Sequence, residues 1–178
     1  MKKNAAGKAK NIKLIILDVD GVMTDGGIII GSGKEEYKRF EVKDGTGVAI
    51  ARNVGLEFAI ISGRFSGAIT NRAREMKIRA VFQDVKIKMR AYEKLKSRFK
   101  LKDSEICFIG DEIIDLPVIK KCGFSAAPFD AVAEVKRAAD FVTKKGGGKG
   151  CVRETIGFIL KKKGLWKEAV YRYLKNEK

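Results

Sequence analysis

LIILDVDG, residues 14–21, is the segment from which the architecture of this chain can be worked out. It opens with an uninterrupted apolar run, which is typical of a strand buried on both faces of a sheet. Asp18 and Asp20 follow directly, although carboxylates are rarely buried unless a cation is near them. In an open α/β sheet, ligands bind at the carboxyl ends of the strands, and two such oxygen donors there suit Mg²⁺ together with a phosphate. The alternative is a polar turn that follows a strand.

The length and composition of the chain predict one ordered domain. The chain has 178 residues, of which 45% are hydrophobic and only two are proline. We expect a single domain over residues 1–178, with a basic N-terminal arm at 1–11 and a C-terminal tail at 164–178. No apolar run has the length of a membrane span, and no signal-peptide core follows the basic start, so we expect no membrane association. The cysteines lack metal-ligand spacing and indicate reduced thiols in a cytoplasmic protein: Cys107, Cys122 and Cys151.

The chain has no histidine and a formal net charge of +16. The absence of histidine excludes a histidine-nucleophile phosphatase, a Ser-His-Asp hydrolase and a zinc site with histidine ligands, so carboxylates or lysine must carry any acid–base chemistry. The positive charge is typical of nucleic-acid-binding proteins, and also of heat-adapted proteins rich in lysine and glutamate. Because the lysines are dispersed among glutamates and aromatic residues do not alternate with them, we favour the second interpretation and expect no nucleic-acid partner.

Strand-like and helix-like segments alternate along the chain. The fold class predicted from them is α/β, a three-layer, Rossmann-like parallel sheet with helices on both faces and a β-hairpin insert after the first strand. Asp44 is the expected N-cap of the first long helix, which ends near Gly55. The hairpin is expected at residues 26–31 and 35–42. Strands are expected at residues 14–17, 56–61, 80–82, 105–109, 124–126 and 140–142, and further helices at 66–76, 87–99, 110–122, 131–138, 152–162 and 165–174.

Polar residues of unusual kinds follow three of the predicted strands. They are Asp18 with Asp20, Ser62 with Arg64, and Asp111 with Asp115. Right-handed crossovers in a parallel sheet bring all of these strand ends to one edge. Lys88 lies at the start of a helix, from which its ammonium group can reach the same edge. Taken singly, Ser62 suits a turn, Lys88 a solvated helix face and Asp111 a helix N-cap, but their order along the chain favours a common site.

These residues resemble the motifs of the haloacid dehalogenase superfamily of phosphotransferases. The matching segments are DVDG at 18–21, ISGR at 61–64, Lys88, and GDEIID at 110–115. The resemblance extends from residue 12 to about residue 155. Within the superfamily, DVDGVMTDG at 18–26, EVKDG at 41–45, GGKG at 147–150 and VRE at 152–154 are similar to the family of 3-deoxy-D-manno-octulosonate 8-phosphate phosphatases. Glu112 departs from the pattern, which more usually has aspartate at that position.

Phosphoryl transfer suits these residue types. A phosphate monoester repels nucleophiles, so catalysis must come from positioning and charge neutralisation. Asp18 is the expected nucleophile and gives an aspartyl-phosphate. Asp20 is the expected general acid toward the leaving oxygen and then the general base toward water. Ser62 would donate to a phosphoryl oxygen, and Lys88 would place a compact positive charge beside it.

The expected cofactor is Mg²⁺, held by Asp18, Asp111 and the main-chain carbonyl of Asp20. Asp115 and Glu112 are expected to support this site. Asp115 would orient Lys88 or metal-bound water, and Glu112 keeps the charge of the usual aspartate on a longer side chain.

The resemblance also implies the substrate. The activity expected from it is Mg²⁺-dependent hydrolysis of 3-deoxy-D-manno-octulosonate 8-phosphate in lipopolysaccharide precursor synthesis. An acid of this kind needs a cation at its carboxylate end, which Arg64 and Arg72 can supply. A phosphatase for a nine-carbon, sialic-acid-type 9-phosphate is an alternative because one carbon changes only the pocket depth required. A nucleic-acid-binding protein with a vestigial phosphatase site is another. Residues expected to contact substrate are Asp20, Lys43, Asp44, Gly45, Gly63, Arg64, Arg72 and Lys88.

The motifs leave no room for a lid domain. Only the hairpin separates the first motif from the next helix, and about 24 residues separate the second motif from the third. An open site either admits a macromolecule or is covered by a neighbouring subunit. The isoleucines at 28–30 favour a subunit contact at the hairpin. The resemblance implies a homotetramer with hairpins at the subunit contacts and a C-terminal tail that reaches a neighbour's site.

Overall fold

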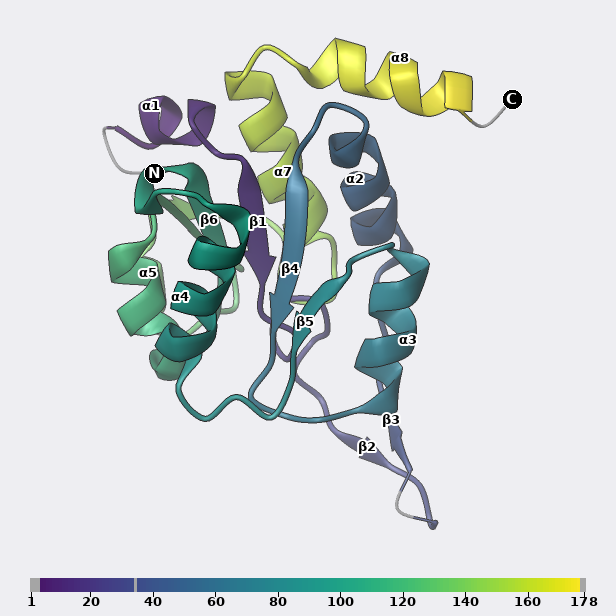
Figure 1. Cartoon of the computed structure of the whole chain (residues 1–178). Coiled ribbons are helices and arrows are strands. Elements are labelled where there is room, and N and C mark those ends of the chain that lie inside the picture. Colours follow the sequence, from purple (N-terminus) through teal and green to yellow (C-terminus); the bar gives the residue numbers. More distant parts are fainter. Residues whose placement is uncertain (1–3, 34, 177–178) are drawn as a thin grey trace.

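A parallel sheet forms the centre of the molecule. The computed structural model describes residues 4–33 and 35–176. The strand order is β5-β4-β1-β6-β7-β8, and every neighbouring pair is parallel. Figure 1 shows β5, β4, β1 and β6 side by side in this sheet. This arrangement confirms the predicted α/β class. The strands are β1 (Leu14–Leu17), β4 (Glu57–Ile61), β5 (Ala80–Phe82), β6 (Ile106–Ile109), β7 (Phe124–Ala127) and β8 (Phe141–Val142).

Helices cover both faces of the sheet. One apolar cluster joins α1, α2, α3, α7 and α8 to one face, and a second joins α4, α5 and α6 to the other. In β1, Ile15 and Leu17 belong to the first cluster, while Leu14 and Ile16 belong to the second. The unbroken apolar run in β1 therefore reflects burial on both faces, as predicted. The helices are α1 (Ala5–Lys10), α2 (Val42–Arg52), α3 (Gly67–Glu75), α4 (Lys88–Phe99), α5 (Leu116–Lys121), α6 (Ala133–Ala138), α7 (Cys151–Lys162) and α8 (Trp166–Asn176), with short 3₁₀ helices η1 (Asp103–Glu105) and η2 (Ile113–Asp115).

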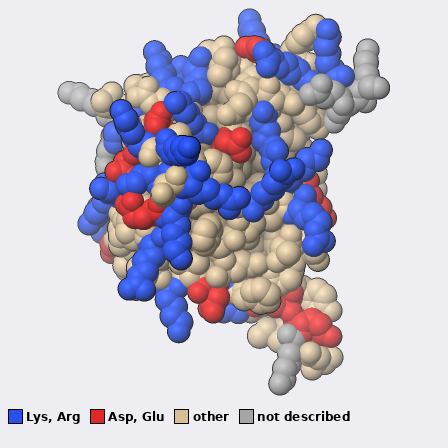
Figure 2. Space-filling model, in the orientation of Figure 1, with Lys and Arg blue, Asp and Glu red and all other residues tan. Residues whose placement is uncertain are grey.

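The surface carries basic and acidic side chains side by side. Figure 2 shows Lys and Arg spread over the face in view, with Asp and Glu among them. Some of these neighbours form ion pairs, such as Lys13 with Glu105 at 2.6 Å and Lys96 with Glu93 at 2.7 Å. This mixture is typical of a lysine- and glutamate-rich surface. Within the described residues, no helix combines the length and the apolar character needed to cross a bilayer.

The hairpin projects beyond the carboxyl edge of the sheet (Figure 1). Its antiparallel strands are β2 (Ile29–Ile30) and β3 (Glu36–Tyr37). Both are shorter than predicted, because an isolated two-stranded ribbon gains no stability from a neighbouring strand and the chain already enters α2 at Val42. The apolar face of the hairpin is solvent-accessible in the single chain, with Ile30 71% exposed.

The start of α2 differs from the prediction. Asp44 was the expected N-cap, but the N-cap is Glu41, whose side chain accepts the N–H of Lys43 at 3.0 Å. Asp44 lies in the first turn and is buried, and its Oδ1 accepts the N–H of Arg153 at 2.7 Å. Arg153 is in the first turn of α7, whose own N-cap, Gly150, has no side chain. Asp44 therefore caps α7 from another helix, a long-range contact that local sequence does not reveal.

Neither end is a free arm or tail in the described residues. The N-terminal segment forms α1, which packs against α7 with Ala5 and Ala9 fully buried. The C-terminal segment forms α8, which packs against α2 and α7 with Ala169 fully buried. The reason is the same at both ends, since helical spacing places small or apolar residues on one face and basic residues on the other. Figure 1 shows both helices at the end of the molecule opposite the hairpin.

Candidate active site

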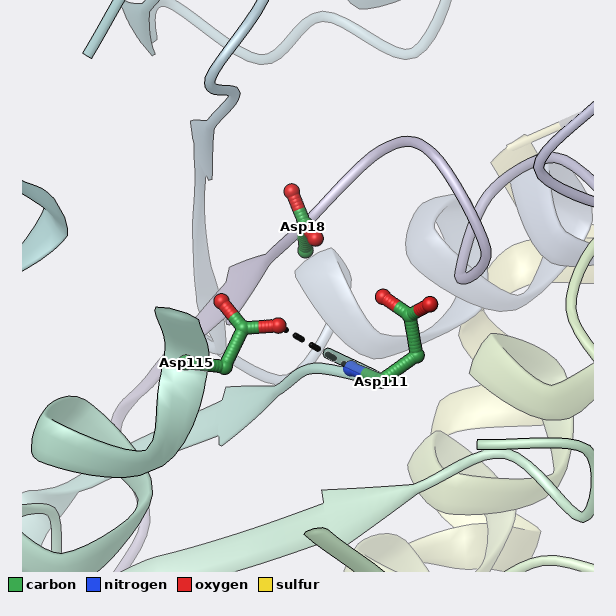
Figure 3. A group of neighbouring side chains, drawn as sticks. All are labelled: Asp18, Asp111 and Asp115. Atoms are coloured by element: carbon green, nitrogen blue, oxygen red, sulfur yellow. Dashed lines mark hydrogen bonds between the residues drawn. The ribbon is translucent and has the colours of Figure 1, made fainter. Parts of the chain in front are cut away.

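The sheet brings the three polar strand ends together. β1 lies between β4 and β6, and its last residue, Leu17, is paired with Ile60 on one side and Ile109 on the other. The residues after these strands therefore meet at the carboxyl edge. The N–H of Asp18 donates to the carbonyl of Ile109 at 3.0 Å, which fixes the first aspartate beside the end of β6. Figure 3 shows Asp18, Asp111 and Asp115 facing one another at this edge.

Lys88 lies between two buried carboxylates. Its Nζ is 2.8 Å from Asp18 and 2.6 Å from Asp115, and all three side chains are almost completely buried. Burial disfavours the charged ammonium, but the two carboxylates outweigh it and raise the pKa of Lys88 above its ordinary value. Lys88 is therefore a fixed positive charge at the first aspartate. It is the first residue of α4, so the helix start holds its backbone in place.

Both oxygens of Asp115 accept hydrogen bonds. One oxygen accepts from Lys88, while the other accepts the N–H of Asp111 at 3.0 Å and of Glu112 at 3.2 Å (Figure 3). Asp115 thus joins α4 to the loop after β6. Gly110 allows this approach, because a Cβ atom there would lie 2.6 Å from the Asp115 carboxylate.

Asp111 is the least satisfied of the three carboxylates. Its Oδ1 is buried and has no hydrogen-bond partner among the described residues. Burial, followed by the charges of Asp18 and Asp115, raises the pKa of Asp111 to about 8. Burial also raises the pKa of Asp18 to about 6, in spite of the opposing effect of Lys88. The site thus gathers more carboxyl groups than its one ammonium group can hold in the charged form.

The donor set fits a divalent cation. One oxygen from each of Asp18, Asp111 and Asp115 lies within 4.8 Å of the other two. Carboxylate oxygens are hard ligands of the kind that Mg²⁺ prefers. The unpartnered oxygen of Asp111 is the clearest sign of such a site, because a buried carboxylate oxygen without a donor is costly unless a cation meets it.

Two glycines make this cluster possible. Gly21 has a φ of +81°, and a Cβ atom there would lie 2.0 Å from Oδ2 of Asp111. Gly147 packs against the other side of the same turn, where a Cβ would lie 2.0 Å from the carbonyl oxygen of Gly21. The glycine loop before α7, which contains Gly147, therefore packs against the turn at Gly21, and that turn packs against Asp111.

The chain is similar to known proteins in both sequence and fold. Residues 81–153 match the family profile of haloacid dehalogenase-like hydrolases. The chain is 39% identical over 162 residues to 3-deoxy-D-manno-octulosonate 8-phosphate phosphatase KdsC of Escherichia coli K12, covering 91% of this chain and 86% of that protein. This chain belongs to the haloacid dehalogenase superfamily. Its relatives place it in the 3-deoxy-D-manno-octulosonate 8-phosphate phosphatase family.

Solved structures of phosphatases in this family have the same fold. The enzyme from Moraxella catarrhalis, determined in complex with a magnesium ion, a phosphate ion and KDO, has a TM-score of 0.93 and 34% identity, and the match covers 97% of this chain and 99% of that one. The enzyme from Yersinia pestis has a TM-score of 0.91 and 35% identity, with 94% and 90% covered.

Asp20 points toward the hairpin rather than into the carboxylate cluster. Its Oδ1 accepts from Nζ of Lys38 at 2.5 Å, and Lys38 is also 2.8 Å from Glu36. Glu36 in turn pairs with Arg64, the residue after the second motif's glycine, at 2.7 Å. Sequence reasoning missed Lys38 and Glu36. Their spacing of two residues places them on one face of the strand predicted at residues 35–42, but it does not indicate which way that face points.

Several predicted residues of this phosphatase family do not contact the carboxylate cluster. The Glu112 side chain is exposed and accepts the N–H of Ile113 at 2.6 Å, so its extra methylene turns the carboxylate away. The Ser62 hydroxyl lies in its own turn, donating to the carbonyl of Arg64 at 2.9 Å. Gly63 lies in the same turn. Lys43 is exposed on the first turn of α2.

Arg72, Gly45 and Asp44 form a separate group at the start of α2. A Cβ atom on Gly45 would lie 2.7 Å from Nη2 of Arg72, so the missing side chain lets the guanidinium lie against the helix. Arg72 donates to the carbonyl of Glu41 at 3.1 Å. Burial raises the pKa of Asp44 to about 6. All three residues were predicted to contact substrate. The sequence did not indicate that they also hold α2 against α3 and α7.

Proposed function

We propose that this chain is an Mg²⁺-dependent phosphatase that hydrolyses 3-deoxy-D-manno-octulosonate 8-phosphate to the free sugar acid and phosphate, in the synthesis of lipopolysaccharide precursors. The observation that carries the proposal is the buried pair of Asp18 and Lys88 beside the unpartnered oxygen of Asp111. The relatives of this chain are named as phosphatases of this substrate. These relatives favour neither a nine-carbon substrate nor a nucleic-acid-binding protein with a vestigial site.

In the first half of the proposed reaction, Asp18 attacks phosphorus in line with the ester bond and forms an aspartyl-phosphate. Lys88 lies 2.8 Å from the nucleophile, so its charge lowers the repulsion between carboxylate and phosphate. Asp20 donates a proton to the leaving sugar oxygen. Asp115 touches neither reacting group and acts by holding Lys88 and the N–H groups of the loop after β6.

In the second half, water attacks the aspartyl-phosphate and Asp20 accepts its proton. Asp18, Asp111 and the main-chain carbonyl of Asp20 would hold Mg²⁺, which supplies positive charge that neutralises the two anions as they approach. The pKa of Asp111, about 8, means that this carboxyl must lose its proton before it can serve as a ligand at neutral pH.

We place the phosphoryl group near Ser62 and Gly63 and the carboxylate of the sugar acid near Arg64. Arg64 is partly exposed and its guanidinium already pairs with a carboxylate, that of Glu36, at 2.7 Å. A substrate carboxylate can take the place of this partner. Lys43, Asp44, Gly45 and Arg72 are the remaining residues that we assign to the sugar-acid side.

We further propose that the enzyme is a cytoplasmic homotetramer. The assembly is supported by the exposed isoleucines of the hairpin, because an apolar face on a strongly charged surface suits a subunit contact. The compartment is supported by the cysteines, which are all buried and unpaired, as in reducing surroundings.

Phosphate release from purified protein tests the activity. We expect turnover of the eight-carbon 8-phosphate with Mg²⁺, loss of turnover with a chelator, and recovery when Mg²⁺ is added in excess. The kcat/KM for a nine-carbon 9-phosphate should be at least about tenfold lower, the usual discrimination for one carbon. A preference for the nine-carbon ester would overturn the substrate assignment, and turnover without a metal would overturn the mechanism.

A further inference from the structure

Lys38 is a lysine whose side chain faces inward from an exposed hairpin. Only 1% of its side chain is exposed, whereas Tyr37 before it is 57% exposed and the side chain of Arg39 after it is 72% exposed. Lysine is almost never this buried unless it is paired. The hairpin thus presents its apolar residues to solvent and a charged residue to the protein, the reverse of an ordinary amphipathic ribbon.

The partners of Lys38 connect both sides of the proposed site. Nζ is 2.5 Å from Oδ1 of Asp20 and 2.8 Å from Oε1 of Glu36. Glu36 uses its other oxygen to accept from Arg64 at 2.7 Å. A line of alternating charges therefore runs from the first-motif loop through the hairpin to the loop after β4. Burial opposes the ammonium charge, but the hydrogen bonds to Asp20 and Glu36 raise the pKa of Lys38 above its ordinary value, so it stays charged at neutral pH.

We propose that Lys38 is a positioning residue that holds the Asp20 carboxylate for proton transfer in both halves of the reaction. This inference rests on the proposed phosphatase function and adds to it. Asp20 follows β1 on a loop, and no other side chain of the described residues is within ion-pair distance of its carboxylate. Without Lys38, no ion pair with a described residue would fix the direction of the Asp20 carboxylate.

Two proton transfers depend on the position of the Asp20 carboxylate. In the first half, a bond forms between an Asp18 oxygen and phosphorus, the bond from phosphorus to the sugar oxygen breaks, and the sugar oxygen takes the proton of Asp20. In the second half, a water oxygen bonds to phosphorus, the bond to the Asp18 oxygen breaks, and Asp20 takes the proton of water. Lys38 makes and breaks no bond in either half.

The test compares two esters that differ in their need for a general acid. A sugar oxygen is a poor leaving group and must be protonated, whereas 4-nitrophenolate leaves without a proton. For Lys38→Met we expect kcat on 3-deoxy-D-manno-octulosonate 8-phosphate to fall roughly 10- to 100-fold, with KM changed less than about threefold. On 4-nitrophenyl phosphate, kcat/KM, which reports only the steps up to the aspartyl-phosphate, should fall less than about threefold, because 4-nitrophenolate leaves without the proton of Asp20. Lys38→Arg should recover part of the loss.

Arg39→Met is the matched control. It removes a cation from the neighbouring residue, which pairs with Asp25 at 2.6 Å outside the site, and we expect both activities to stay at the level of the wild type. Equal losses of kcat/KM on both esters in Lys38→Met would show that Lys38 only holds the hairpin, and a rise in KM alone would show that it binds substrate. Either result overturns the inference while the function stands. If the wild type hydrolyses neither ester, the proposed function fails instead.

Discussion

The three grouped carboxylates differ in how completely their oxygens are partnered. Asp115 accepts from an ammonium group and two N–H groups, Asp18 pairs with the same ammonium, and Asp111 keeps one buried oxygen without a donor among the described residues. The same residue type therefore suits three different tasks. Asp115 is held rigid, Asp18 faces a positive charge, and Asp111 has an oxygen left for a cation.

Replacing the nucleophile should separate activity from folding. We expect Asp18→Asn to lower kcat by at least about 1,000-fold, because an amide cannot form the aspartyl-phosphate. The fold should persist, since the amide has the same size and burial already disfavours the charge of Asp18, raising its pKa to about 6. Phosphate release and thermal unfolding measure the two effects. Asp20→Asn is the comparison, and it should accumulate a slowly hydrolysed phospho-enzyme; turnover at the wild-type level in Asp18→Asn would falsify the covalent mechanism.

Magnesium binding should depend on pH. The pKa of Asp111 is raised to about 8, so below that pH the metal-free protein carries a proton that Mg²⁺ must displace. Affinity for Mg²⁺ should therefore increase as pH rises, by up to about tenfold per unit until pH 8, and level off above it. Titration calorimetry in two buffers of different ionisation enthalpy measures the proton release directly. An affinity that is constant from pH 6 to 8 would contradict the assignment.

Among single residues, those with an unusual type at a strand end could be predicted. Asp18 and Asp111 stand out because a carboxylate within two residues of the end of a buried apolar strand is costly unless a cation lies beside it. Lys38 could not be recognised, because one lysine on a predicted hairpin of a very basic chain looks like any solvated residue. Its importance depends on which way the hairpin folds over the loop after β1.

At the level of elements, α7 depends on a cap supplied by α2. Its N-cap is Gly150, and Asp44 provides the missing acceptor for the N–H of Arg153. We expect Asp44→Ala to destabilise the fold by about 1–2 kcal/mol, the usual cost of losing a side-chain cap. Asp44→Asn keeps an acceptor and removes a charge whose burial raises the pKa to about 6, so at pH 8 it should cost less. Urea unfolding measures both, and equal stabilities for the two variants would count against the cap.

Removal of α8 should affect stability before activity. Leu165, Trp166 and Val170 pack against the core and Ala169 is fully buried, so ending the chain after Gly164 should cost about 3 kcal/mol or more in free energy of unfolding. The helix predicted at residues 165–174 is thus part of the folded body. Ala169→Asp and Lys167→Asp form a matched pair on the buried and exposed faces of α8, and only the first should lower the unfolding midpoint in urea.

The pattern of apolar residues was enough to predict which segments form helices and strands. It was not enough to predict where each element begins and ends. The continuous apolar runs of β1, β4 and β6 predicted buried strands because both of their faces are covered. The start of α2 was predicted wrongly because Asp44 is a residue type typical of N-caps. It caps α7 instead, which is distant in sequence. The hairpin strands were predicted too long, since β propensity alone does not pair residues that lie beyond the sheet.

For the whole molecule, the hairpin is the surface most suited to assembly. We expect the wild type to be a tetramer at micromolar concentration and Ile29→Lys to dissociate into smaller species, because a charge replaces a side chain that is 55% exposed in the single chain. Light scattering after size-exclusion chromatography measures the mass. Lys43→Ala, on an exposed position outside the hairpin, is the control for mass. A monomeric wild type would contradict the proposed assembly.

The convergence of strand ends was predictable from topology alone. Once β1, β4 and β6 are parallel, their carboxyl ends share an edge, whatever the side chains are. Some contacts that organise this edge were not predictable, because they join segments more than a hundred residues apart. Gly147 against the turn at Gly21 is the example, since neither segment specifies the other.

The positions of α1 and α8 have a practical consequence. Both lie at the end of the molecule opposite the hairpin and the carboxyl edge (Figure 1). A tag or a surface linker attached at either end would therefore direct the catalytic edge away from the support. An immobilised phosphatase reactor could use either attachment, with the open edge accessible to small phosphate esters flowing past it.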